Sequence, residues 1–316
     1  MRTLSRTLGS TGLSVGPIGL GCMGMSWAYG ADERDDVQSA AVLTRALDLG
    51  VTLIDTSDVY GPFTNEVLVG KALAGRRDEA VLATKAGLVN VDGGIRPKGD
   101  PDHLRHAIDA SLQRLGTDRV ELWQLHRVDP AVPVEEQWGA MAEAVTAGKV
   151  LHLGMSEVTV AQLEAAHAVH PVASVQSELS LWTREAMAGV LPWCIAHGVA
   201  FLPFSPLGRG FLTGTVSAGS FGSEDFRARN PRFTDEAMTA NQAIVEQVRV
   251  VAARHDAAPG QVALAWLLTL GEHVVPIPGT KKVHYLEQNA AAADLVLTDQ
   301  DLADLATLPD PVGARY

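Results

Sequence analysis

Short apolar segments alternate with amphipathic segments along most of this chain. The apolar runs lie near residues 17–21, 51–55, 80–85, 120–125, 150–154, 172–176, 199–204 and 274–277. Continuous apolar runs of this length are typical of parallel strands that are buried on both faces. Helix-like spacing of apolar residues fills the intervals at 35–49, 64–74, 101–115, 134–147, 159–168, 185–197, 236–254 and 260–270, and continues at 283–293 and 299–308.

The order of these elements predicts the fold. Strands that alternate with helices, with no linker or change of composition, indicate a parallel sheet closed into a (β/α)₈ TIM barrel. A turn at Ser10, Thr11 and Gly12 predicts a short β-hairpin before the first strand, and the last two helices are additions after the eighth. We therefore expect an α/β protein in which residues 1–316 form a single domain.

The composition argues against several classes of partner. The formal net charge is −12 without any block of like charges, so neither a nucleic-acid surface nor an anionic-membrane surface is expected. No apolar stretch approaches the roughly 18 residues of a membrane helix, and residues 1–14 lack the apolar segment of a secretory signal. Cys22 and Cys194 make no disulfide framework, so we expect a cytoplasmic protein.

One connection is long for a compact domain. It runs from Ser205 to Asp235 and is rich in Gly, Ser, Arg and Phe. Its first part, Ser205–Gly214 (SPLGRGFLTG), combines small residues, whose backbone can approach a ligand closely, with a cation. We expect a lid over an anionic cofactor, and the alternative is a surface insertion without a function.

Residues 19–24 (GLGCMG) match the dinucleotide-binding pattern G-x-G-x-x-G. That pattern holds a pyrophosphate only where a strand turns directly into a helix. Here no helix is expected before about residue 35. We therefore reject a Rossmann domain and infer that these glycines let the loop after the first strand pass close to the barrel mouth.

Ionisable residues stand at the ends of three successive predicted strands. Asp55, Lys85 and His126 each end or directly follow an apolar run, and Tyr60 follows the first of them. The carboxyl ends of the strands form the catalytic face of a parallel barrel. We therefore expect these four side chains to meet at one rim.

Such a set is suited to protonating a carbonyl oxygen. A tyrosine has a pKa of about 10, but a neighbouring ammonium lowers it, and a carboxylate holds that ammonium charged and oriented. Lys85 and Asp55 can play these parts beneath Tyr60, while His126 orients the substrate oxygen. Each residue alone also has a structural interpretation, as a buried ion pair, a core histidine or a lining aromatic. Their shared position at one rim favours function.

At these residues the chain resembles the aldo-keto reductases. The resembling stretches cover nearly every loop expected at the catalytic rim: Ile54–Leu73 (IDTSDVYGPFTNEVLVGKAL), Ala83–Gly87 (ATKAG), Gln124–Pro130 (QLHRVDP), Gly148–Ser156 (GKVLHLGMS), Val175–Ser180 (VQSELS), Pro203–Gly214 (PFSPLGRGFLTG) and Ile277–Lys282 (IPGTKK). The HRVDP and IPGTK phrases resemble the bacterial and plant branch. The resemblance implies that Tyr60 is the general acid, that Lys85 lowers its pKa, that Asp55 pairs with Lys85 and that His126 orients the carbonyl.

The resemblance also implies a nicotinamide cofactor. Ser156 and Gln176 would bind its carboxamide and Phe204 would stack on its ring. The family's asparagine after Ser156 is replaced by Glu157, so only the serine is carried over. The other cofactor-binding residues implied are Cys22, Met23, Gly24 and Asp55 beneath the ring, Ser205, Pro206, Leu207, Gly208 and Arg209 along the pyrophosphate, Gly279, Thr280, Lys281 and Lys282 after the eighth strand, and Gln288 and Asn289 at the adenine.

The choice between the two nicotinamide cofactors rests on a second departure. Many relatives carry an arginine where this chain has Tyr285, which leaves Lys281 and Lys282 as cations for a 2′-phosphate. A bare ribose needs no positive charge, so the lysine pair favours NADPH. The alternative is a pair of solvated lysines at a helix start, where the helix dipole disfavours cations.

We therefore expect reduction of aldehydes or ketones to alcohols with NADPH, without a metal and with a small carbonyl compound as substrate. Trp27, Phe63 and Arg127 follow strands one, two and four and are expected to line the substrate pocket. The main rival is a nicotinamide-sensing binding protein that resembles the barrel subunits of potassium channels, which also keep the four rim residues. No regulatory segment precedes the hairpin, which favours the enzyme. A metal-dependent hydrolase barrel is disfavoured because no His-x-His or bridging-lysine set follows the strands.

Overall fold

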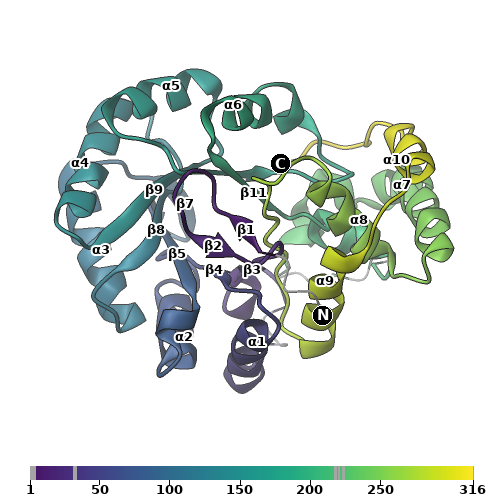
Figure 1. Ribbon diagram of the computed structural model, residues 1–316, viewed down its shortest axis with the longest axis horizontal. Helices are drawn as coiled ribbons and strands as arrows, with labels where there is room; N and C mark the ends of the chain where they lie inside the picture. Colours follow the sequence, from purple (N-terminus) through teal and green to yellow (C-terminus); the bar gives the residue numbers. More distant parts are fainter. Residues whose placement is uncertain (1–4, 31–33, 217–218, 220, 223–224, 316) are drawn as a thin grey trace.

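The centre of the molecule is a parallel sheet that curves into a barrel (Figure 1). The computed structural model describes residues 5–30, 34–216, 219, 221–222 and 225–315. The strand order is β11-β10-β9-β8-β5-β4-β3, and neighbouring strands are parallel. The strands are β3 (Leu20–Gly21), β4 (Leu53–Asp55), β5 (Val81–Ala86), β8 (Val120–Leu125), β9 (Val150–Ser156), β10 (Ser174–Glu178) and β11 (Ala200–Phe204). The predicted fold class is confirmed.

The eighth predicted strand closes the barrel without forming a regular ladder. On one side, Val275 and Ile277 donate backbone N–H groups to carbonyls of β11 at 2.9 and 3.0 Å. On the other side, the carbonyls of Pro276 and Pro278 accept hydrogen bonds from the β3 segment at 2.9 and 3.2 Å. Because proline has no N–H, this side of the segment can accept but cannot donate. The segment therefore closes the barrel, but toward β3 these prolines only accept backbone hydrogen bonds and donate none.

This closure explains two of the glycines in the G-x-G-x-x-G pattern. A Cβ at Gly19 would lie 2.9 Å from a side-chain carbon of Ile277, and a Cβ at Gly21 would lie 2.9 Å from its carbonyl oxygen. Both glycines are needed for close packing between the first and last strands. A Cβ at Gly24 would meet only the ring of Tyr29, at 3.5 Å, and the expectation that these glycines let the loop pass close to the barrel mouth stays a prediction.

Helices surround the barrel in the order that the sequence predicts (Figure 1). After a short 3₁₀ turn η1 (Met23–Met25), the first α-helix starts at Asp36, so no helix directly follows the glycine pattern. Helix ends carry ordinary signals: Asp100 caps α3 by accepting from His103 N at 2.9 Å, and Gly116 ends it with φ 66°. The helices are α1 (Asp36–Asp48), α2 (Thr64–Leu73), α3 (Pro101–Leu115), α4 (Val134–Thr146), α5 (Val160–Val169), α6 (Val190–His197), α7 (Asp235–Arg254), α8 (Pro259–Leu268), α9 (Val283–Ala291) and α10 (Asp299–Ala306).

An N-terminal hairpin covers the amino end of the barrel. Strands β1 (Arg6–Thr7) and β2 (Ser14–Val15) pair antiparallel, as predicted, and Figure 1 shows them across the barrel. Leu8 and Val15 are buried in the same cluster as the inward side chains of the barrel strands. This apolar plug leaves the carboxyl ends of the strands as the end available for chemistry.

A second hairpin lies between β5 and α3 and was not predicted. Its strands are β6 (Leu88–Val91) and β7 (Gly94–Pro97), which pair antiparallel. The turn residues Asp92 and Gly93 have φ values of 50° and 78°. An Asp-Gly pair between β-prone residues is a recognised signal for such a turn, so the sequence contained a local signal for this hairpin.

The long connection after β11 packs against the barrel. It contains the 3₁₀ turns η5 (Gly208–Thr213), η6 (Phe226–Arg229) and η7 (Pro231–Phe233). The ring of Phe211 stacks on Trp182 with centroids 4.2 Å apart, and Arg232 donates to the Trp182 carbonyl at 3.0 Å. At its other edge, the backbone of Phe226 donates to the carbonyl of Ala28 at 3.1 Å. The described part of this loop therefore joins the β3 and β10 sides of the rim. Within the described residues, no helix has the length and apolarity needed to cross a membrane.

Candidate active site

A buried lysine holds the centre of the predicted site together. Lys85 lies on β5, and its Nζ donates to Asp55 Oδ2 at 2.5 Å, to the Thr56 carbonyl at 2.8 Å and to the Tyr60 hydroxyl at 3.3 Å. Asp55 ends β4, the neighbouring strand, so the register of the barrel brings the pair together. The structure thus joins three of the four predicted residues through one ammonium group.

Burial and charge act in opposite directions on these groups. Burial lowers the pKa of Lys85, but Asp55 and Tyr60 outweigh it, so the pKa lies above its ordinary value and the lysine stays charged. Burial raises the pKa of Tyr60 above 10, and the nearby Lys85 offsets this only in part. Lys85 thus lowers the pKa of Tyr60 as expected, but burial is the larger effect and the net shift is upward. Tyr60 keeps its proton at neutral pH and can donate it.

Two glutamines complete the surroundings of the carboxylate. Gln124 and Gln176 both donate from Nε2 to Asp55 Oδ1, at 3.0 and 2.9 Å, and all three side chains are buried. Gln124 was missed by the sequence reasoning, although an amide inside an apolar strand, two residues before His126, was a signal. Gln176 was expected at the nicotinamide, and its amide nitrogen here belongs to the Asp55 network.

His126 directly follows β8 and faces the tyrosine. Its ring centroid lies 5.8 Å from that of Tyr60 in an edge-to-face arrangement, and its Nδ1 lies 3.1 Å from Ser57 Oγ. Burial, followed by the charges of Lys85 and Arg127, lowers the pKa of His126 well below its ordinary value. The ring is therefore neutral at physiological pH and carries a single N–H proton.

Two of the predicted pocket residues lie next to this set. The ring of Trp27 lies 5.7 Å from that of Tyr60. Arg127 donates from Nη1 to the His126 carbonyl at 2.6 Å and to Ser156 Oγ at 3.0 Å. Arg127 thus bridges the end of β8 and the end of β9, between the histidine and the predicted cofactor serine.

Phe63 lies elsewhere. It precedes α2 with a left-handed backbone, φ 67°, and is 54% exposed. Its ring packs against the guanidinium of Arg114, whose carbon lies 4.7 Å from the ring centroid. Because Arg114 belongs to α3 in the outer helical layer, we leave Phe63 out of the substrate pocket.

Several predicted nicotinamide residues share the rim next to Asp55. Ser156 ends β9, and its register partner Gln176 lies in the middle of β10. Phe204 ends β11, where it is half-buried against the inner barrel cluster. Cys22 precedes Met23 and Gly24 in the turn η1, and its backbone donates to the Asp55 carbonyl at 2.9 Å. These positions are compatible with one elongated ligand along the rim.

In the loop after β11, the arginine forms an ion pair within the protein. Ser205, Gly208 and Arg209 all have positive φ, so the backbone from Ser205 through Pro206 and Leu207 to Arg209 turns tightly. The Arg209 guanidinium is buried and pairs with Glu178 Oε2 at 3.0 Å. If this loop lines a pyrophosphate, the contact comes from its backbone, because the Arg209 charge is matched by a carboxylate of the protein.

Glu157, which stands where the resemblance predicts an asparagine, adds a second carboxylate beside Glu178 at this rim. Glu157 has φ 53°, a left-handed conformation that asparagine, the residue expected here from the resemblance, adopts more readily than glutamate. Its carboxylate accepts from the backbone of Glu178 at 2.9 Å and also pairs with Arg315. Neither Glu178 nor Arg315 was singled out from the sequence.

The predicted phosphate-binding residues surround the start of α9. Gly279 bridges to Gly21, Thr280 Oγ1 accepts from Lys282 N at 3.1 Å, and Lys282 is the N-cap residue of the helix. Lys281 Nζ donates to the Gly30 carbonyl at 3.4 Å. The two residues of α9 that were predicted to face the adenine differ in burial: Gln288 is exposed and Asn289 is buried.

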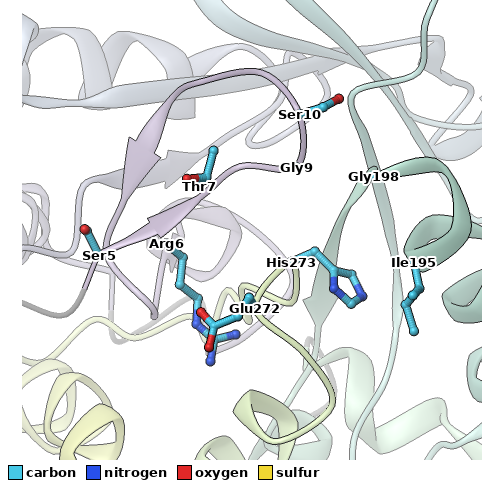
Figure 2. Close-up of a pocket in the computed structure, with 9 residues that line it drawn as sticks. All are labelled: Ser5, Arg6, Thr7, Gly9, Ser10, Ile195, Gly198, Glu272 and His273. Carbon is cyan, nitrogen blue, oxygen red and sulfur yellow. The ribbon is translucent and has the colours of Figure 1, made fainter.

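A separate hollow of about 510 Å³ lies at the opposite end of the barrel, around the N-terminal hairpin (Figure 2). Arg6 lines it and donates to the carbonyls of Gly271 and Val274 at 2.6 Å. The hollow contains no residue of the site above, so it is not the candidate active site. In the part of the chain that the structure describes, no three His, Cys, Asp or Glu side chains are placed to hold a metal ion.

Comparisons with known proteins show the family of this chain. The model of the aldo/keto reductase family matches residues 17–309. The glycerol dehydrogenase AKR11B4 from Gluconobacter oxydans is 26% identical, with coverage of 100% of this chain and 99% of that chain and a TM-score of 0.89. The aldo-keto reductase AKR11C1 from Bacillus halodurans is 25% identical, with coverage of 100% and 98% and a TM-score of 0.81. An aldo/keto reductase from Klebsiella pneumoniae, solved with NADP and acetate, is 25% identical, with 98% coverage of both chains and a TM-score of 0.76.

The narrower expectation, the bacterial and plant branch, stays a prediction. The family match spans every strand of the barrel and all four rim residues. The chain therefore belongs to the aldo/keto reductase family of oxidoreductases.

Proposed function

We propose that this protein reduces aldehydes or ketones to alcohols with NADPH, with Tyr60 as the proton donor. The observation that carries the proposal is the buried Lys85 ammonium, which donates to both Asp55 and the Tyr60 hydroxyl. A structural ion pair alone does not require a tyrosine as the third partner. The arrangement places a proton and its stabilising charge together at the carboxyl rim.

Each residue of the set then has a distinct part. Tyr60 gives its hydroxyl proton to the carbonyl oxygen of the substrate, and the Lys85 ammonium stabilises the phenolate that remains. Asp55, held by two glutamine amides, keeps the lysine in position. His126 donates an N–H to the same carbonyl oxygen. The bound NADPH supplies the hydride.

The residues around α9 fit the 2′-phosphate of NADPH. The first turn of a helix has N–H groups without intrahelical partners, which favours an anion there. Lys281 and Lys282 directly precede this turn, and the turn contains no acidic residue. Relatives from Klebsiella pneumoniae were solved with NADP and with NADPH, which supports the same cofactor for this chain.

The proposal is tested by mixing the protein with NADPH and a panel of aldehydes, ketones and sugars. We expect loss of the cofactor absorbance with at least one carbonyl compound, at a rate proportional to enzyme concentration. NADPH binding without turnover of any compound would instead support the nicotinamide-sensing alternative. A parallel series with NADH measures the cofactor preference.

A further inference from the structure

Ser57 lies between the substrate-orienting histidine and a buried carboxyl group. Its Oγ is 3.1 Å from His126 Nδ1, 3.2 Å from Asp58 Oδ1 and 3.3 Å from the Lys85 carbonyl oxygen. The backbone N–H of Val59 also donates to Ser57 Oγ, at 3.4 Å. All of these side chains are buried, so water does not readily replace any of the contacts.

The serine has one hydroxyl proton for three acceptors. Because His126 is neutral, its ring has one proton too, either on Nδ1 or on Nε2. If Ser57 donates to Nδ1, the ring proton is on Nε2. If Ser57 donates to Asp58, two lone pairs would face each other across the Ser57–His126 contact unless the ring proton moves to Nδ1. The partner that Ser57 selects therefore decides which nitrogen can donate.

We propose that Asp58 is a positioning residue that sets the tautomer of His126 through Ser57; this rests on the proposed function for its catalytic consequence. A neutral Asp58 donates its O–H to Ser57, which then donates to Nδ1 and leaves Nε2–H for the substrate carbonyl. An ionised Asp58 is a stronger acceptor than a neutral ring nitrogen and takes the serine proton. His126 then donates from Nδ1 to Ser57, and Nε2 can only accept.

The surroundings of Asp58 make this change possible at neutral pH. Burial, followed by the negative Glu66 of α2, raises the pKa of Asp58 to about 7. The Ser57 hydroxyl, Arg114 of α3 and the Val59 N–H act in the opposite direction. Glu66 itself accepts from Thr84 Oγ1 and from Arg114 Nε, both at 2.6 Å. The charge of Glu66 is thus paired, and Asp58 is the group on this face that titrates near neutrality.

If Asp58 sets the tautomer of His126 in this way, we expect His126 to lose its hydrogen bond to the substrate as the pH rises. Tyr60 has a pKa above 10 and His126 is already neutral, so neither explains a change near pH 7. Without an N–H at Nε2, one hydrogen bond to the carbonyl oxygen is missing. We expect kcat/KM for carbonyl reduction to fall about tenfold between roughly pH 6 and pH 8.

The decisive measurement is the ring ¹⁵N spectrum of histidine-labelled protein, with the His126 signals assigned by their absence in His126→Gln. We expect a proton on Nε2 below neutral pH and on Nδ1 above it. Asp58→Asn keeps an N–H₂ donor toward Ser57, so His126 should stay protonated on Nε2 throughout. Ser57→Ala breaks the connection and should remove the pH response as well. The surface variant Asp109→Asn, whose carboxylate pairs with Lys149, should retain it.

The outcomes separate this inference from the proposed function. A His126 tautomer that does not change with pH, or one that still changes in Asp58→Asn, overturns the inference whatever the enzyme catalyses. Absence of carbonyl turnover with an observed tautomer change removes the proposed function and leaves the tautomer control standing. With turnover present, an unaltered pH profile of kcat/KM in Asp58→Asn also overturns the catalytic role of Asp58.

Discussion

Lys85 Nζ and Asp55 Oδ2 lie 2.5 Å apart across adjacent barrel strands, and 0% and 4% of their side-chain surfaces are exposed. Removal of one partner from such a pair leaves a buried charge without compensation. We expect Asp55→Asn to lower the free energy of unfolding by about 3–5 kcal/mol, measured by urea denaturation.

The matched control for this prediction is Asp48→Asn. Asp48 pairs with Arg76 at 2.7 Å, but both side chains are partly exposed and screened by solvent, so the expected loss is much smaller than for Asp55→Asn. Equal losses in the two variants would show that the Asp55–Lys85 pair is no more important to stability than a surface contact.

Replacement of Tyr60 by phenylalanine removes only the hydroxyl group. We expect turnover of a good aldehyde substrate to fall by about 10² or more, as is usual for loss of a general acid. NADPH affinity, measured by quenching of protein fluorescence, should hardly change. A variant that keeps more than roughly a tenth of the parent rate rules out Tyr60 as the proton donor.

Lys281 and Lys282 are expected to distinguish NADPH from NADH. Their change to alanine together removes charge-assisted contacts to the 2′-phosphate, so the NADPH dissociation constant should rise about tenfold or more. NADH binding should hardly change, and added salt should weaken NADPH binding more in the parent than in the variant. Equal losses for both cofactors would instead assign the lysines to support of the loop.

Phe204 is expected to stack on the nicotinamide ring. Phe204→Ala should weaken NADPH binding by about 0.5–1.5 kcal/mol, the scale of an aromatic pair beyond its buried area. Phe204 also packs against the inner barrel cluster, so thermal unfolding is measured in parallel. An unchanged NADPH affinity with lower thermal stability would show that its role is core packing.

The buried Asp58 should make stability depend on pH. Its pKa rises from 3.8 to about 7 on folding, so folded protein binds the proton more tightly than unfolded protein does. Its contribution to stability is therefore complete below about pH 4 and is lost as the pH rises through 7. The free energy of unfolding of the parent minus that of Asp58→Asn should fall by on the order of 3–4 kcal/mol over this range. A difference that does not vary with pH would contradict the raised pKa.

Local patterns were sufficient for most of the fold. The helix predicted at 101–115 is observed as Pro101–Leu115, because an Asp cap, a following proline and a terminal glycine are all local signals. The strands were also recognisable, since burial on both faces forces continuous apolar sequence, but their bounds were less exact: the run at 172–176 is observed as Ser174–Glu178. The meeting of Asp55, Lys85 and His126 followed from this, because parallel strands share one carboxyl edge.

Tertiary structure decided what depends on distant neighbours. The eighth segment could be recognised as apolar, but its incomplete pairing depends on the side toward which Pro276 and Pro278 face. Glu178 meets Arg209 and Arg315 from separate parts of the chain, and no spacing rule relates them.

The pKa of Tyr60 shows the same limit within the site itself. The sequence identified its charged neighbour Lys85, which lowers the pKa as expected, yet burial raises the pKa by more. The charge of Lys85 is a property of its residue type, and its place at a strand end was readable from the pattern, so the sequence determined which charged group lies near Tyr60. Desolvation depends on every atom packed around the hydroxyl, so only the folded structure determined the direction in which its pKa moves.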